Sequence, residues 1–171
     1  QSLGLQSHSN FDSFSLSGRR KNEKKINEIN SKIISHCIKN NNKLLGICYG
    51  GEILALALGG TIKKMNAIQK GEQDITTILE NPLCSGRLKV FQSHNYQISK
   101  LNEQLVTVAE SETCQHEIIK HSSLDIFGTQ FHPEMSKDGQ KIIESFATNG
   151  WIEIDEDAVR GEDLRITCET N

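Results

Sequence analysis

Cys48 is the residue of this 171-residue chain best placed to act as a nucleophile. It lies between Gly46 and Gly50, where a short apolar segment ends and a second one of helical composition begins. Flanking glycines tolerate a sharp, strained turn and leave room for a substrate. At such a turn the helix dipole favours the thiolate, and the N–H of Tyr49 can hold a developing oxyanion. The alternative is a structural cysteine in a core strand, and the turn alone leaves both roles open.

A second group of reactive side chains follows an apolar segment near the end of the chain. Residues 125–131 are followed directly by His132, Pro133 and Glu134. A histidine at the end of one strand can reach a turn at the end of a neighbouring strand, and an acid two residues later can bond its other ring nitrogen. A lone histidine is more often a surface or structural residue. The His-Pro-Glu arrangement after an apolar strand favours a catalytic role.

Three further histidines are weaker candidates. His94 could act as a second base, but a histidine that lines a pocket is the commoner case. His116 and His121 flank an apolar segment, and we predict that both lie at the surface.

Alternating strands and helices are expected to position Cys48. Residues 11–18 are predicted to form a strand that runs into a glycine turn, and residues 19–42 carry isoleucines at helical spacing. Residues 43–48 are predicted to form a brief buried strand, and residues 51–58 a helix that ends at glycines. This order is typical of an α/β protein with a parallel sheet.

The chain changes character after residue 60. Six short β-branched segments predict mixed or antiparallel additions to the sheet, at residues 61–65, 74–79, 88–93, 104–111, 116–121 and 125–131. Residues 136–150 are predicted to form a closing helix. We divide the chain into an irregular N-terminal end (residues 1–10), one domain (residues 11–148) and an acidic C-terminal tail (residues 149–171).

The composition argues against several classes of protein. A net charge of -3 gives no electrostatic footprint for nucleic acid or for an anionic membrane. No apolar run approaches the roughly 20 residues of a membrane span. The five cysteines include no Cys-x-x-Cys pair, so neither a disulfide framework nor a metal site is supported. We therefore expect a soluble, cytoplasmic protein.

The sequence GICYG at residues 46–50, followed far downstream by GTQFHPE at residues 128–134, resembles the class I (triad) glutamine amidotransferases. That family has G-I/V-C-x-G at its nucleophile and G-x-Q-F-H-P-E at its acid–base strand, and the two motifs in this order are specific. The similarity covers residues 11–147. Within the family, the middle of the chain is most similar to the amidotransferase subunits of GMP synthases, especially the free-standing archaeal kind.

The resemblance implies a three-layer, flavodoxin-like α/β fold around a mostly parallel central sheet. It also implies hydrolysis of glutamine to glutamate and ammonia through a cysteinyl thioester. Cys48 would be the nucleophile, His132 the proton carrier and Glu134 the group that orients the imidazole. The oxyanion donors map to the backbone N–H groups of Tyr49 and Arg19. The positions that contact glutamine map to Gly18, Gly50, Glu52, Ser93, His94 and Asn95.

The chain departs from the family pattern at Glu52 and Arg19. Glu52 stands where the family commonly has Gln; its carboxylate would oppose thiolate formation and lacks the N–H donors of an amide. Alternatively, Glu52 points to solvent and stabilises the first helical turn. Arg19 replaces a glycine of the oxyanion loop, where a backbone flip is cheap only for glycine. The first strand, helix and second strand of the family have no room before Phe11, so we expect the fold to lack its N-terminal strands.

No nucleotide-activating loop occurs in the sequence, so we expect no cofactor in this chain and assign ATP and magnesium to a partner. The resulting hypothesis is a glutaminase subunit for purine nucleotide biosynthesis, which supplies ammonia to an ATP-dependent, GMP synthase-like synthetase. No nucleic-acid or membrane partner is expected. The alternatives are a different synthetase partner, a γ-glutamyl hydrolase, or a docking subunit in which Arg19 and Glu52 have ended turnover.

Overall fold

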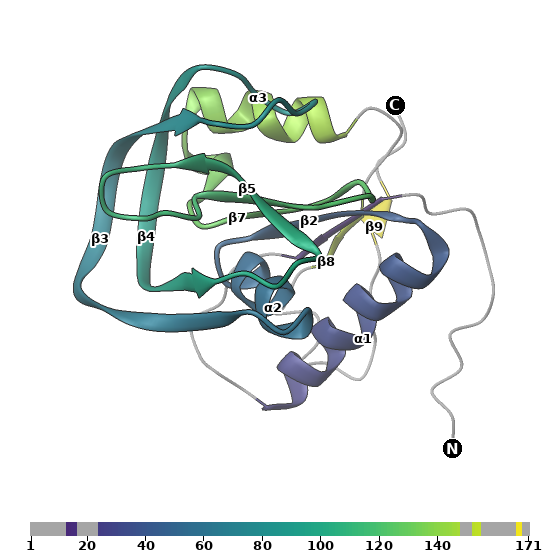
Figure 1. The fold of residues 1–171 in the computed structure, drawn as a ribbon. Helices are drawn as coiled ribbons and strands as arrows, with labels where there is room; N and C mark the ends of the chain where they lie inside the picture. Colours follow the sequence, from purple (N-terminus) through teal and green to yellow (C-terminus); the bar gives the residue numbers. More distant parts are fainter. Residues whose placement is uncertain (1–12, 17–23, 148–151, 155–166, 169–171) are drawn as a thin grey trace.

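Helices alternate with strands in the first third of the chain, and strands dominate its middle (Figure 1). The computed structural model describes residues 13–16, 24–147, 152–154 and 167–168. Within them, the helices are α1 (Lys24–Asn40), α2 (Tyr49–Ala57), the short 3-10 helix η1 (Pro133–Met135) and α3 (Lys137–Phe146). The strands are β1 (Ser13–Leu16), β2 (Lys43–Ile47), β3 (Thr61–Thr77), β4 (Arg87–Lys100), β5 (Leu105–Glu110), β6 (Ile118–His121), β7 (Ile126–Thr129), β8 (Ile152–Ile154) and β9 (Thr167–Cys168).

The strands of the described residues form one mixed sheet in the order β4-β3-β5-β6-β7-β2-β1-β8-β9. Its centre is parallel, because β2 pairs in parallel with both β7 and β1, and β1 pairs in parallel with β8. The strands contributed by residues 61–129 pair antiparallel with one another. The parallel centre and the antiparallel additions both agree with the pattern expected from the sequence.

The two strands β2 and β7 of the parallel centre carry apolar residues toward both faces, since each face is covered by helices. In β2, Leu44 packs into the cluster that includes α1 and α2, whereas its neighbour Leu45 packs into the cluster that includes α3. Ile126 and Phe127 of β7 divide between the two clusters in the same way. Figure 1 shows α1 and α2 below the sheet and α3 above it. The result is a three-layer arrangement whose buried strands read as continuous hydrophobic runs.

The β3–β4 hairpin is longer than its hydrophobic pattern indicated. Residues 61–65 and 74–79 were expected to form separate strands, but they belong to one strand, and β4 extends seven residues beyond the predicted end at residue 93. The intervening residues of β3 are mostly polar or exposed; the side chain of Ile68, for example, is 67% exposed. Backbone pairing with β4, with a register shift between Lys64 and Gln69, therefore holds this part of the strand without an apolar core.

The prediction that His116 and His121 lie at the surface is wrong. They are 7% and 5% exposed: His121 is the last residue of the buried strand β6, and His116 lies two residues before the start of that strand. The His116 Nδ1 atom lies 2.7 Å from the Thr107 hydroxyl, and the His121 Nδ1 atom accepts from the Ser123 N–H. Burial lowers the pKa of both imidazoles, which favours their neutral form.

The ends of the chain enter the structure only in part. Residues 1–10 lie outside the described residues. In the C-terminal tail, β8 extends the parallel centre beside β1, and β9 pairs antiparallel with β8. The proposed division at residues 10 and 148 remains a prediction. In the described part of the chain, none of the helices has the length and apolar character needed to cross a membrane.

Candidate active site

Cys48 lies on a tight turn between β2 and α2. Its backbone has φ 49° and ψ -104°, a combination that non-glycine residues rarely adopt. The turn is held from both sides: the Cys48 N–H donates to the carbonyl of Thr129 in β7 (2.8 Å), and the Cys48 carbonyl accepts from the N–H of Glu52 in α2 (3.0 Å). This is the strand-turn-helix conformation of a nucleophile elbow, and it confirms the bend expected from the flanking glycines.

The glycines of the turn are required by close packing of α2 on the sheet. A Cβ at Gly46 would lie 2.6 Å from the carbonyl carbon of Gly50, and a Cβ at Gly50 would lie 2.3 Å from the carbonyl oxygen of Leu16 in β1. Contacts this short with backbone atoms leave no room for a side chain. The glycines therefore bring the start of α2, and with it the Cys48 thiol, directly against the ends of the parallel strands.

His132 follows β7 and meets the elbow from the neighbouring strand. Its backbone N–H donates to the carbonyl of Phe91 in β4 (2.9 Å), which fixes the residue between β7 and the hairpin. Its Nδ1 atom lies 2.7 Å from the Glu134 Oε1 atom. Pro133 is the first residue of η1, and its ring restricts the backbone between the two side chains. The imidazole and the carboxylate therefore form an oriented pair.

The His132 imidazole also interacts with the Cys48 thiol. The pKa of His132 is raised to about 10, first by its side-chain hydrogen bond to Cys48 and second by that to Glu134. At neutral pH this pKa favours the imidazolium form of His132, whose ring is hydrogen bonded to the Cys48 sulfur. The three residues of the expected triad converge, as the two sequence motifs indicated.

Glu52 is buried beside the elbow. Its side chain is 5% exposed, and its Oε1 atom accepts from the Gln130 Nε2 atom at 3.0 Å. The alternative in which Glu52 points to solvent is therefore wrong. Gln130, which the sequence analysis did not single out, also accepts from the Ile98 N–H through Oε1 (3.0 Å). It is the Gln of the GTQFHPE motif, so its position beside the His-Pro-Glu residues was the available signal.

The three consecutive candidates of β4 do not point in one direction. His94 is 6% exposed and faces the interior, whereas Ser93 is exposed and Asn95 half-buried, in keeping with the alternation of a strand. Both ring nitrogens of His94 are engaged within the protein. This argues against the second-base role considered for His94. Among the other candidates, Gly18 and Arg19 lie outside the described residues.

Most of the chain is similar to one family of known proteins. Residues 4–149 match the model of the family described as glutamine amidotransferase class-I. The chain belongs to the class I glutamine amidotransferase family.

Two curated relatives of this family are subunits of glutamine-hydrolyzing GMP synthases. The Pyrococcus furiosus protein is 34% identical over 121 residues, which cover 68% of this chain and 64% of the relative. The Thermococcus kodakarensis protein is 34% identical over 122 residues, which cover 68% of this chain and 65% of the relative. The chain thus spans somewhat less than two thirds of the length of these relatives.

Solved amidotransferase structures have a similar fold. A protein from Thermoplasma acidophilum that is described as a GMP synthase subunit superposes with a TM-score of 0.70 at 26% identity, covering 79% of this chain and 70% of that one. A glutamine amidotransferase from Thermotoga maritima superposes with a TM-score of 0.64 at 23% identity, covering 78% and 62% of the two chains. The three-layer, flavodoxin-like α/β architecture is that of the class I family.

Proposed function

We propose that this chain hydrolyses glutamine to glutamate and ammonia and delivers the ammonia to a synthetase partner. The observation that carries the proposal is the convergence of Cys48, His132 and Glu134 at a strained strand-to-helix turn. A thiolate–imidazolium pair oriented by a carboxylate is the arrangement required for nucleophilic attack on an amide.

In the first half of the reaction, the Cys48 sulfur attacks the carbon of the side-chain carboxamide, and the carbonyl π electrons move onto oxygen. The N–H of Tyr49, the first residue of α2, and that of Arg19 are the proposed donors to this oxyanion. When the oxyanion collapses, the carbon–nitrogen bond breaks. The His132 imidazolium gives its proton to the leaving nitrogen, so that ammonia departs and a thioester remains on Cys48.

In the second half, water attacks the thioester carbon. Neutral His132 takes a proton from the attacking water, and the carbon–sulfur bond of the tetrahedral intermediate breaks. Glutamate and the Cys48 thiolate are released beside the restored imidazolium. Glu134 keeps the His132 ring in the required orientation through both halves by accepting from Nδ1.

We assign glutamine binding to Gly18, Gly50, Glu52, Ser93, His94 and Asn95, with different physical roles. Gly50 admits the close approach of α2 to β1 that positions the elbow, and the exposed Ser93 and half-buried Asn95 offer polar groups from β4. For Glu52 and His94 the assignment is indirect, because both side chains are bonded within the protein.

The proposed partner is an ATP-dependent synthetase of the GMP synthase type, in purine nucleotide biosynthesis. The proposal rests on the names of the relatives, which are subunits of glutamine-hydrolyzing GMP synthases. Nucleotide, ATP and magnesium would bind to the synthetase, and this chain would use no cofactor of its own. Cys37, Cys48, Cys84 and Cys114 are free thiols, which supports a reducing location such as the cytoplasm.

The test is selective modification of the nucleophile together with its removal. A diazo-ketone analogue of glutamine should label Cys48 and spare Cys37 and Cys114, whose thiols have pKa values raised to about 12 by burial. Cys48→Ala should lower glutamine hydrolysis by at least about 10³-fold, since only the covalent step is lost. Cys84→Ala is the matched control, because Cys84 is only partly buried and packs at the edge of the core. Equal labelling of Cys48 and Cys84, or turnover that survives Cys48→Ala, would refute the proposal.

A further inference from the structure

Three buried polar side chains form a continuous hydrogen-bonded chain behind the site. Glu117, which directly precedes β6, is fully buried, and so is Gln92 of β4. The Gln92 Nε2 atom lies 2.9 Å from each of the two Glu117 carboxylate oxygens. The Gln92 Oε1 atom lies 2.9 Å from the His94 Nε2 atom. None of these contacts is needed for the chemistry at Cys48.

The far end of the chain is the backbone of β4 itself. The His94 Nδ1 atom lies 2.7 Å from the carbonyl oxygen of Tyr96. With the amide of Gln92 turned so that it donates to Glu117, His94 faces a carbonyl oxygen at each ring nitrogen. Both nitrogens must then donate, which is possible only for an imidazolium. In this arrangement Glu117 is a carboxylate and His94 a cation.

Burial acts against both of these charges. Burial is the largest cause of the lowered pKa of His94 and of the raised pKa of Glu117. A second arrangement has no charges at all: Glu117 is protonated and donates to the Gln92 oxygen, and the Gln92 amide, rotated by half a turn, donates to a bare His94 Nε2 atom. The Tyr96 carbonyl accepts from Nδ1 in both. The two arrangements contain the same number of protons, so the unit is neutral in each.

We propose that Glu117, Gln92 and His94 form a relay that shares one proton between its two ends and fixes the part of β4 that carries Ser93 and Asn95. The proposal rests on the proposed function, since these two residues are among the positions assigned to glutamine binding. His94 and Glu117 are positioning residues in it. Without the relay, β4 would have a buried unpaired charge or an unpaired amide beside the site, which a folded protein does not tolerate well.

The ionisable groups that surround the relay are consistent with a neutral unit. The charge of His132 disfavours a cation at His94. Glu52 reaches the same Tyr96 carbonyl through Gln130, whose Nε2 atom is 3.3 Å from it. Burial is the largest cause of the raised pKa of Cys114, and the charges of Glu117 and Glu52 add to it, whereas a backbone hydrogen bond at His116 and the charge of Lys63 lower it.

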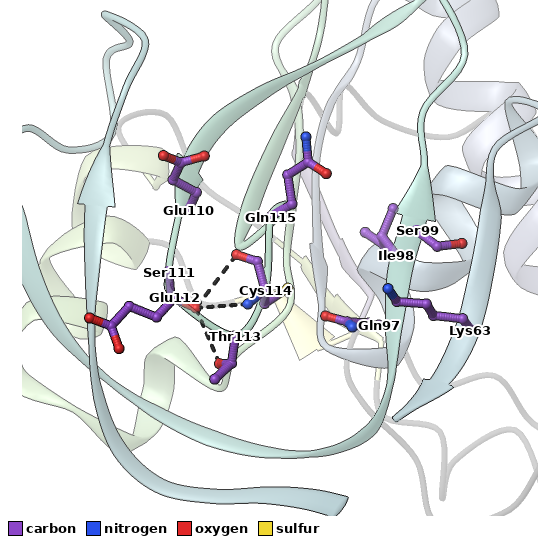
Figure 2. Close-up of a pocket in the computed structure, with 10 residues that line it drawn as sticks. All are labelled: Lys63, Gln97, Ile98, Ser99, Glu110, Ser111, Glu112, Thr113, Cys114 and Gln115. Carbon is purple, nitrogen blue, oxygen red and sulfur yellow. Dashed lines mark hydrogen bonds between the residues drawn. The ribbon is translucent and has the colours of Figure 1, made fainter. Parts of the chain in front are cut away.

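The outer end of the relay reaches a polar cavity. The Ser111 hydroxyl donates to the Glu117 Oε1 atom at 2.7 Å. Ser111 lies on one wall of a cavity of about 330 Å³, with Lys63 and Ser99 on the opposite wall (Figure 2). Figure 2 also shows the Ser111 hydroxyl beside Thr113 and Cys114, to which it is hydrogen bonded. The described residues that line this cavity include no member of the triad, and the Ser111 hydroxyl stands between the cavity and the fully buried Glu117 carboxylate.

The experiment compares Glu117→Gln and Gln92→Met with the wild-type chain. Glu117→Gln removes the counter-charge and keeps the shape of the side chain, whereas Gln92→Met removes the bridge. The measurement is an NMR titration of the nitrogen and proton signals of the His94 ring. In both variants, the ring should lose its second proton about one pH unit lower than in the wild type. The KM for glutamine should rise about 10-fold with kcat changed less than about threefold, since the triad is intact.

Glu112→Gln is the matched control, because it removes a carboxylate from the same loop without touching Gln92, and it should leave both measurements at the wild-type values. Unchanged His94 signals in both relay variants would overturn the shared proton. A shifted His94 signal with unchanged KM would overturn the positioning role. If the wild-type chain hydrolyses no glutamine, the proposed function fails, and the NMR measurement still decides whether the relay exists. If Glu117→Gln does not fold, Gln92→Met alone tests both the shared proton, through the His94 signals, and the positioning role, through the KM.

Discussion

The two walls of the candidate site are built by different means. The parallel centre of the sheet, with β2, β7 and α2, places Cys48 through backbone conformation and through glycines that admit no side chain. The β3–β4 hairpin places Ser93 and Asn95 through strand pairing and through buried polar side chains behind β4. The first wall is determined by backbone conformation and close packing; the second is held by hydrogen bonds whose protons can move.

This difference suggests a division of labour between the walls. A chemical step requires reacting atoms within a few tenths of an ångström of their final positions, and packed backbone can hold them there. A strand that binds substrate has only to present polar groups. We therefore expect changes in the first wall to lower kcat or stability, and changes in the second to raise KM.

The largest expected effect in this comparison is at Glu134. Glu134→Gln should lower kcat about 100-fold, which corresponds to about 2.7 kcal/mol of transition-state stabilisation, because the imidazole loses its orienting carboxylate. Since Glu134 contributes to the raised pKa of His132, the pH at which the imidazolium is lost should move down from about 10. Steady-state kinetics between pH 6 and 10 would measure both effects.

Ser93→Ala is the contrasting variant for that prediction. It should raise the KM for glutamine several-fold and leave kcat and the pH profile near the wild-type values. If Glu134→Gln and Ser93→Ala gave the same pattern, the proposed division between the two walls would be wrong.

The next largest expected difference is in stability, between alanine substitutions at two glycines. A Cβ at Gly50 would lie 2.3 Å from backbone of β1, so Gly50→Ala should lower the free energy of unfolding by about 3 kcal/mol, the upper part of the usual range for overpacking. Gly71 in β3 has φ 113° but no atom within 4 Å of a Cβ. Gly71→Ala should therefore cost only its backbone strain, about 1 kcal/mol. Urea unfolding curves of both variants would test the difference, and equal losses would contradict it.

The smallest expected effect is at Glu52, where the family commonly has Gln. In Glu52→Gln, an amide oxygen can still accept from Gln130, but the buried negative charge one helical turn from Cys48 is gone. Thiolate formation should become easier, and kcat/KM for glutamine should rise by up to about tenfold, with the acid limb of the pH profile moved to lower pH. Kinetics from pH 6 to 9 on both forms would measure this. Identical profiles would show that the carboxylate has no catalytic consequence.

The elements that depend on local sequence pattern were predictable. Three short patterns each predict the local structure that they form: the apolar run of β2, the glycines around Cys48 and the His-Pro-Glu sequence after β7. The full length of β3 was not predictable, because its central residues are polar on both sides and only the ladder with β4 extends it. The burial of His116 and His121 was also missed, because it depends on packing between segments far apart in the sequence.

The hydrogen-bonded chain behind β4 had no sequence signal of its own. Glu117 and Gln92 are 25 residues apart and belong to different segments. Polar residues in an otherwise apolar environment are the only hint, and a single sequence does not indicate which of them meet. Only the hydrogen bonds seen in the structure identify this part of the site.

The positive φ of Cys48 has a consequence for how the chain could change over generations. A backbone in this region costs on the order of 1–3 kcal/mol for a residue with a side chain, and a glycine at position 48 would relieve it. A substitution of Cys48 by glycine would therefore gain stability and lose the thiol. Selection for turnover opposes that substitution, whereas selection for docking does not. The strained cysteine thus costs stability that a role in docking alone would not require.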